Sequence, residues 1–71
     1  MSEAEKAQQR FNAAAKEYWK FNSKRDQALA AGETPSAFVQ QEVNVNLRIC
    51  LALAAIFTDL DTSAMESNPN K

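Results

Sequence analysis

The chain has 71 residues, with 8 basic and 9 acidic side chains and a formal net charge of −1. Its single cysteine excludes an internal disulfide, and the absence of histidine removes the common sets of structural zinc ligands. A near-neutral chain has no strong electrostatic attraction for nucleic acid or acidic lipid. A chain this short needs very good packing or a partner chain for stability.

The first predicted element is a helix over residues 2–31. Its start, Ser2-Glu3-Ala4-Glu5, matches a capping box, in which the serine hydroxyl accepts from the N–H of Glu5 and the Glu5 carboxylate reaches back. Apolar residues then recur at steps of three and four, which is the helical period. This stripe consists of Ala4, Ala7, Phe11, Ala15 and Tyr18. Gly32 follows as a left-handed C-cap.

A turn over residues 32–34 leads to a second predicted helix over residues 35–62. Thr34 is a suitable N-cap, and Pro35 fits the first helical position, where its missing N–H costs nothing. Residues 43–49 alternate apolar and polar side chains, which is also a strand pattern. We prefer the helix because the segment continues through Leu51–Ala55 without a breaker and a lone strand would have nothing to pair with.

The short connection makes the two helices antiparallel neighbours. The sequence therefore predicts an all-α fold, a two-helix antiparallel hairpin of coiled-coil type over residues 1–62. Residues 63–71 are mostly polar, and we expect them to form a flexible, disordered tail.

The second predicted helix is apolar over more than half of its circumference, in two stripes turned by about 100°. The first stripe consists of Phe38, Val45, Ile49, Ala52, Leu53, Ile56 and Leu60. The second consists of Val39, Val43, Leu47, Cys50, Ala54 and Phe57. Periodicity does not decide which stripe faces the first helix. We expect the first stripe to do so and the second to bind a partner protein.

Two residues have further expected roles. Trp19 stands at the edge of the first helix's stripe, where it either joins the partner-binding surface or leans over the helix–helix seam as core. Cys50 lies between Ile49 and Leu51 and suits a small buried hydrophobe better than a reactive thiol. A lone thiol also fits a reducing cytoplasm.

Enzymatic chemistry is not expected. Histidine, the usual general base, is missing, and Asp59 and Asp61 are two residues apart and share no helix face. We predict no catalytic residue, metal site or cofactor. The uncharged run between Arg48 and Asp59 is too short to cross a bilayer, which takes about 18–20 residues, and the N-terminus lacks signal-peptide features. We therefore expect a cytoplasmic protein without membrane contact.

Basic residues beside aromatic ones allow a nucleic-acid reading, because such surfaces can bind single strands. The residues concerned are Lys16, Lys20, Lys24 and Arg25, beside Tyr18, Trp19 and Phe21. The same pattern is explained by lysines that face solvent while the aromatic residues point the other way. We prefer this interpretation to nucleic-acid binding. We expect no nucleic-acid partner.

The stretch around the turn resembles the small YscE-type co-chaperones of type III secretion. It reads Leu29-Ala30-Ala31-Gly32-Glu33-Thr34-Pro35-Ser36-Ala37-Phe38-Val39-Gln40-Gln41. Those chains are of similar size and run helix, Leu-Ala-x-Gly turn, then a second helix that opens with an aromatic residue and glutamines. Their second helix becomes apolar and closes near an acidic-leucine pair, as Asp59-Leu60 does here.

The resemblance implies a hairpin that binds and stabilises a larger helical-repeat chaperone. In that family, the heterocomplex keeps the needle-forming subunit of a virulence apparatus unpolymerised in the bacterial cytoplasm. An alternative is a self-associating hairpin, in which two copies form a four-helix bundle and act as a small adaptor or regulator.

Overall fold

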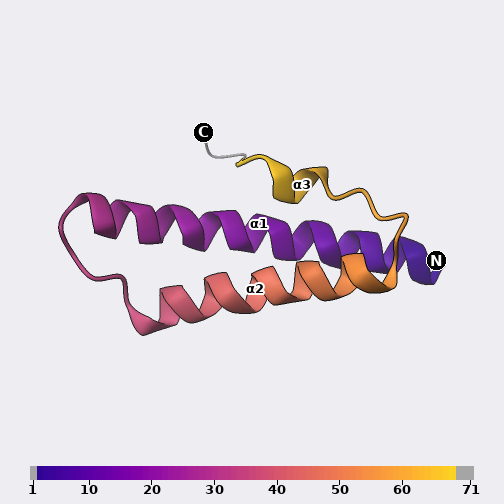
Figure 1. The fold of residues 1–71 in the computed structure, drawn as a ribbon, viewed down its shortest axis with the longest axis horizontal. Coiled ribbons are helices and arrows are strands. Elements are labelled where there is room, and N and C mark those ends of the chain that lie inside the picture. Colours follow the sequence, from indigo (N-terminus) through magenta and orange to yellow (C-terminus); the bar gives the residue numbers. More distant parts are fainter. Residues whose placement is uncertain (1, 69–71) are drawn as a thin grey trace.

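The computed structural model describes residues 2–68, which form three helices: α1 (Glu3–Ala30), α2 (Ala37–Ile56) and α3 (Ser63–Glu66). α1 and α2 pack side by side and antiparallel along a body of 45 × 23 × 18 Å (Figure 1). The described part of the chain contains no strand, and residues 43–49 lie within α2. The predicted all-α helical hairpin is therefore confirmed.

Local sequence explains where α1 begins. The Ser2 hydroxyl accepts from the N–H of Glu5 at 3.2 Å and donates to the Glu5 carboxylate at 3.3 Å. One exposed N–H of the first turn is thereby satisfied, and the early Glu3 and Glu5 suit the positive end of the helix dipole. The predicted cap is correct in this respect, and the helix differs from the predicted 2–31 by one residue at each end.

The end of α1 is a Schellman motif around Gly32. The N–H of Gly32 donates to the carbonyl of Leu29 at 3.1 Å, and the N–H of Glu33 donates to the carbonyl of Ala28 at 2.8 Å. These bonds require a left-handed residue after the cap, and Gly32 has a φ of 76°. The predicted glycine C-cap is confirmed.

α2 is shorter at both ends than the predicted 35–62. Its N-cap is Ser36 and not Thr34, because the Ser36 hydroxyl accepts from the N–H of Val39 at 3.2 Å. At the other end, the N–H of Phe57 makes the last helical bond, to the carbonyl of Leu53 at 2.8 Å. The chain then turns and crosses the N-terminal end of α1 (Figure 1).

The hairpin core lies where α1 presents small residues to α2. Ala7, Ala14 and Ala15 are buried, so the two helices approach closely, and Phe11 fills the space between them with 1% of its surface exposed. On α2, Val43 and Cys50 are buried against this face, at 3% and 1% exposure. The Cys50 thiol points at the carbonyl of Phe11, with 3.8 Å between sulfur and oxygen.

The seam of α2 toward α1 follows alternating steps of four and three, as in a coiled coil. Its buried or half-buried members are Val39, Val43, Asn46, Cys50, Leu53 and Phe57. The expectation that Val43 and Cys50 are left free for a partner is therefore wrong, because both are covered by α1. Most of this seam belongs to the stripe that was expected to face outward.

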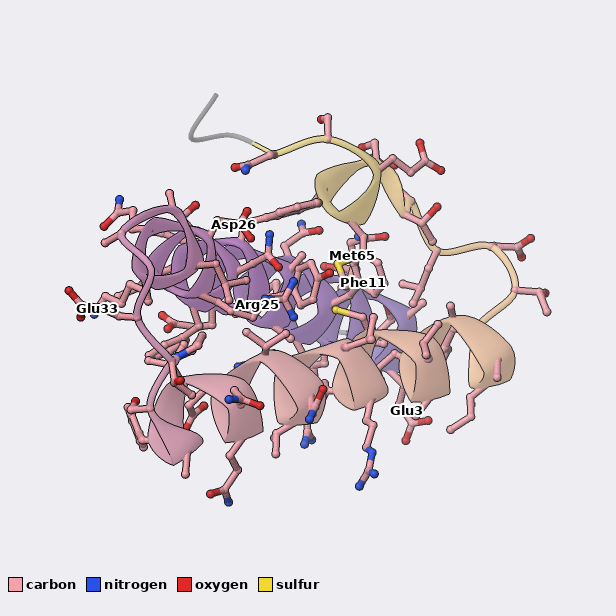
Figure 2. The ribbon with its side chains drawn as sticks, turned by 60° about the vertical axis from the view of Figure 1, so that its left-hand side comes forward. Glu3, Phe11, Arg25, Asp26, Glu33 and Met65 are labelled. Carbon is pink, nitrogen blue, oxygen red and sulfur yellow. The ribbon has the colours of Figure 1, made fainter. Side chains whose placement is uncertain are left out.

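Residues 63–68 differ from the expected flexible tail. α3 lies along α1 (Figure 1), and Leu60, Ala64 and Met65 pack against the cluster of Phe11 and Cys50. Figure 2 shows Met65 next to Phe11, between the three helices. Residues 69–71, the rest of the predicted tail, lie outside the described residues.

The conformation of Gly32 leads to a stability prediction. Gly32→Ala should lower the free energy of unfolding by about 1–2 kcal/mol, because alanine is strained in the left-handed region. A Cβ at this position meets nothing within 4 Å, so the loss is one of backbone strain and not of a clash. Urea denaturation followed by circular dichroism measures it. Gly32→Asn, which tolerates this conformation better, should lose less; an equal loss would contradict the cap assignment.

The position of Cys50 gives a chemical test of the seam. Burial raises the pKa of the Cys50 thiol and shields it, so alkylation by iodoacetamide should be slow in the native protein. The matched control is Leu51→Cys in a Cys50→Ala chain, because Leu51 is 62% exposed one residue away. The control should react at least about tenfold faster, which corresponds to an opening free energy above about 1.4 kcal/mol. Equal alkylation rates would show that Cys50 is exposed and does not belong to the seam.

Candidate interaction surface

The C-terminal segment covers one flank of the hairpin and is fastened there by polar contacts with α1. The Trp19 indole N–H donates to the carbonyl of Ala64 at 3.0 Å. Gln8 bonds the backbone of Asp61 in both directions, donating from its amide nitrogen to the carbonyl and accepting from the N–H, each at 2.9 Å. Gln8 thus holds the segment that leads into α3, and Trp19 holds α3 itself.

α3 is also stabilised within its own turn. The N–H of Ser63 donates to the Asp61 carboxylate at 3.0 Å, and this bond holds the pKa of Asp61 below its usual range. The Thr62 hydroxyl donates to the Glu66 carboxylate at 3.1 Å, and the N–H of Met65 donates to the carbonyl of Thr62 at 3.0 Å. A four-residue helix is therefore closed by bonds at both ends.

Trp19 does not lean over the seam of α1 and α2 as a core residue, which was one of its two expected roles. It is half-buried, stands edge-on to Tyr18 with 4.9 Å between ring centroids, and anchors the C-terminal segment. The expectation of a core tryptophan placed the ring over the seam of α1 and α2. The structure instead places it between α1 and α3, on the flank that the hairpin itself does not close.

The other flank of the hairpin carries uncovered apolar side chains. Phe38, Val45 and Ile56 on α2 are 61%, 41% and 71% exposed. Together with the half-buried Ile49 and the exposed Ala52, they form one line along α2, which we call the open strip. These residues belong to the stripe that was expected to face α1. Of that stripe, Ile49, Leu53 and Leu60 do pack against the core cluster.

α1 borders the open strip with aromatic and basic groups. Phe21 meets Phe38 edge-on with 5.6 Å between ring centroids, and the ammonium groups of Lys20 and Lys24 lie 5.5 and 5.4 Å from the Phe21 ring. Nearer the N-terminus, a shallow groove runs between the helices. It is lined by Glu3, Lys6, Ala7, Arg10, Leu53 and Phe57.

The amount of exposed surface agrees with an uncovered flank. The accessible surface is 5002 Å². A compact monomer of 7.9 kDa is expected to expose about 4,400 Å². The difference reflects an elongated hairpin with one unclosed side. Contiguous apolar patches of this kind mark interaction sites more often than scattered single residues do.

In the structure, the expected partner-binding residues of α2 fall into a buried group and a half-buried group. Val43 and Cys50 are buried in the seam, while Val39, Leu47, Ala54 and Phe57 are half-buried around it. Ala54 lines a small apolar groove with Met65, so it belongs to the covered flank. The sequence identified the open strip as an apolar stripe, but the stripe was assigned to face α1. Its residues are Phe38, Val45, Ile49, Ala52 and Ile56, at helical spacing.

The described residues include no group of three side chains that could hold a metal ion. Within residues 2–68, no helix has the length and apolar character needed to cross a membrane. No protein-family model, curated protein or solved structure matches this chain. The function must therefore be inferred from the surface of the protein. The open strip is the most distinctive feature of that surface.

Removal of the Met65 side chain tests whether α3 closes its flank. Met65→Ala should lower the free energy of unfolding by about 1–2 kcal/mol, below the range for a fully buried methionine. Trp19 is the only tryptophan, so its fluorescence reports on α3 and should shift to the red as the segment loosens. Ser67→Ala, an exposed neighbour, is the control and should change neither quantity. An unchanged emission in Met65→Ala would show that α3 is held without this contact.

Proposed function

We propose that this chain is a non-enzymatic binding module, a helical hairpin that docks on a partner protein through its open strip. The observation that carries the proposal is the exposure of Phe38, Val45 and Ile56 along one line of α2. Their burial against a partner supplies the apolar contact that α1 cannot provide on that flank. The supporting physics is the association of apolar surfaces, worth roughly 25 cal/mol per Å² removed from water.

The partner that we propose is a helical-repeat chaperone of type III secretion, and through it the needle-forming subunit. This choice rests on the resemblance of residues 29–41 to the YscE-type co-chaperones. In this proposal the hairpin acts in the bacterial cytoplasm, stabilises the chaperone by binding its folded form, and so helps keep the needle subunit unpolymerised. The concave surface of a helical-repeat protein is suited to an elongated helical ligand.

The covered flank has a supporting role in this proposal. Because α3 packs over Phe11 and Cys50, the large apolar side chain that stays exposed beside it on α2 is Leu51, whereas the open strip has Phe38, Val45 and Ile56 exposed. The larger apolar area of the open strip then sets the orientation of the complex in this proposal. The basic groups Lys6 and Arg10, which border the strip, add a polar rim that can select among apolar partners.

Co-expression with candidate chaperone and needle subunits, followed by affinity purification, tests the proposal. Phe38→Asp and Ile56→Asp should each reduce recovery of the complex at least about tenfold, because a charge would be desolvated at the contact. Leu29→Asp is the matched control, since Leu29 is also apolar and 58% exposed but lies at the end of α1. It should leave the complex intact.

The same experiment can reject the proposal. If both strip variants keep their helix content and still bring the complex down as well as the unmodified chain, the open strip is not the docking surface. If no candidate chaperone binds the unmodified chain, the proposed partner class is wrong, whatever the strip does.

A further inference from the structure

α2 carries two complete coiled-coil seams, shifted by one residue. The inner seam, toward α1, is Val39, Val43, Asn46, Cys50, Leu53 and Phe57. The outer seam is Phe38, Glu42, Val45, Ile49, Ala52 and Ile56. Both follow steps of four, three, four, three and four, which is the a/d spacing of a coiled coil. The outer seam contains the open strip and adds one charged position, Glu42.

A helix with this spacing on a second face is built to pack on a second helix. The outer seam extends over 18 residue steps, or about 27 Å at the rise of an α-helix. Its occupant is therefore a helix of similar length, and the residue types along the seam restrict which helix fits. Besides its β-branched residues, the seam has one aromatic, one acidic and one small side chain, namely Phe38, Glu42 and Ala52.

We propose that the outer seam closes on a second copy of this chain, with the two α2 helices antiparallel about a two-fold axis level with Leu47. In this register Phe38 lies opposite Ile56 of the second copy, and Val45 lies opposite its Ile49. Glu42 lies opposite Ala52 of the second copy, whose small side chain leaves room for the carboxylate to pass. Glu42 with Ala52 pairs a long with a small side chain, and the other layers pair apolar residues. Each pair occurs twice, as an isologous interface requires.

Charge supports the same register. In each hairpin, the groove beside Leu53 is lined by Lys6 and Arg10, with Glu3 as its acidic residue. Neither Lys6 nor Arg10 forms an ion pair within residues 2–68, where the recorded pair is Lys20 with Glu17. Because Ala52 precedes Leu53, Glu42 of the second copy enters at this groove. Its carboxylate thereby gains a basic partner. Because Phe11 lies level with Cys50 in the antiparallel pair, Arg10 lies nearer than Lys6 to the level of Ala52.

A parallel arrangement fits poorly. In register, it would place Glu42 against Glu42 of the second copy, and like charges at a partly buried contact are disfavoured. It would also set Phe38 against Phe38 at one end and leave the basic groove without an acid. In the single hairpin Glu42 is half-buried and accepts a bond of 3.4 Å from the Asn46 amide, which also donates to the Glu42 carbonyl at 2.8 Å. Asn46 thus keeps one partner when Glu42 is replaced.

This inference goes beyond the proposed function, because it concerns the chain without its partner. The same strip would serve both contacts, so the homodimer and the complex with a chaperone exclude each other. Dimerisation would then cover the open strip until a partner with higher affinity displaces one copy.

Sedimentation equilibrium of the purified full chain tests the inference. At about 100 µM, a hundredfold above a micromolar dissociation constant, the protein should have the mass of a dimer. Glu42→Arg and Arg10→Glu should each weaken the dimer about tenfold, and the double variant should restore it, because the two charges exchange places. Lys16→Glu makes the same charge change beside α3, away from the strip, and should leave the dimer unchanged.

Cysteine cross-linking tests the antiparallel register. In a Cys50→Ala chain, Val45→Cys and Ile49→Cys variants are oxidised separately and as a mixture. The antiparallel register predicts a disulfide mainly in the mixture, between position 45 of one copy and position 49 of the other. A parallel dimer would cross-link Val45→Cys on its own, which would overturn the proposed register. Leu29→Cys, exposed but off the strip, is the control and should not cross-link.

A monomer at that concentration would overturn the dimer, and a double variant no better than the singles would overturn the Glu42–Arg10 contact. These outcomes are separable from failure of the proposed function. A monomer that still binds a chaperone through Phe38 and Ile56 rejects only the dimer. A dimer with intact charge-swap behaviour that binds no candidate chaperone rejects only the proposed partner.

Discussion

The close packing of α1 on α2 around Phe11 and Cys50 is the contact on which the rest of the structure depends. The small side chains of Ala14 and Ala15 let the helices approach, and Phe11 then fills the space between them. This contact fixes which side of α2 is inner and which is outer. It also creates the apolar site into which Met65 packs, so the position of α3 follows from it.

The two long helices could be predicted from the sequence because their signals are local. Ser2 with Glu5 marks the start of α1, and Gly32 marks its end through a conformation that glycine adopts without strain. The face of α2 could not be predicted, because two apolar stripes about 100° apart satisfy the same period. Asn46 also contributed to the wrong choice of the α2 face that packs on α1. A polar side chain suggests an outward position, yet Asn46 is 8% exposed and bonds the carbonyl of Glu42 within its own helix.

The end of α2 and the docking of α3 depend on contacts distant in sequence. No glycine or proline lies between Ile56 and Pro69, so no helix-breaking residue marks the turn that follows Ile56. The helix ends there because the chain gains more by returning Leu60 and Met65 to the core cluster than by continuing into solvent. For the same reason, the sequence assigned the two apolar stripes of α2 to the wrong sides, with the open strip expected to face α1. Its residues were identified as apolar, but their exposure is decided by which flank the returning segment covers.

The bonds between Gln8 and Asp61 join residues 53 positions apart, and Trp19 reaches Ala64 over 45 positions. They have a consequence for the order of events during synthesis. The hairpin contacts between α1 and α2 are available as soon as residue 56 has emerged, whereas the flank around Phe11 and Cys50 stays uncovered until residues 60–66 follow. A nascent chain that pauses between these points presents two apolar flanks instead of one. The flank around Phe11 and Cys50 is therefore closed only after the hairpin of α1 and α2 can form, when residues 60–66 become available to pack on it.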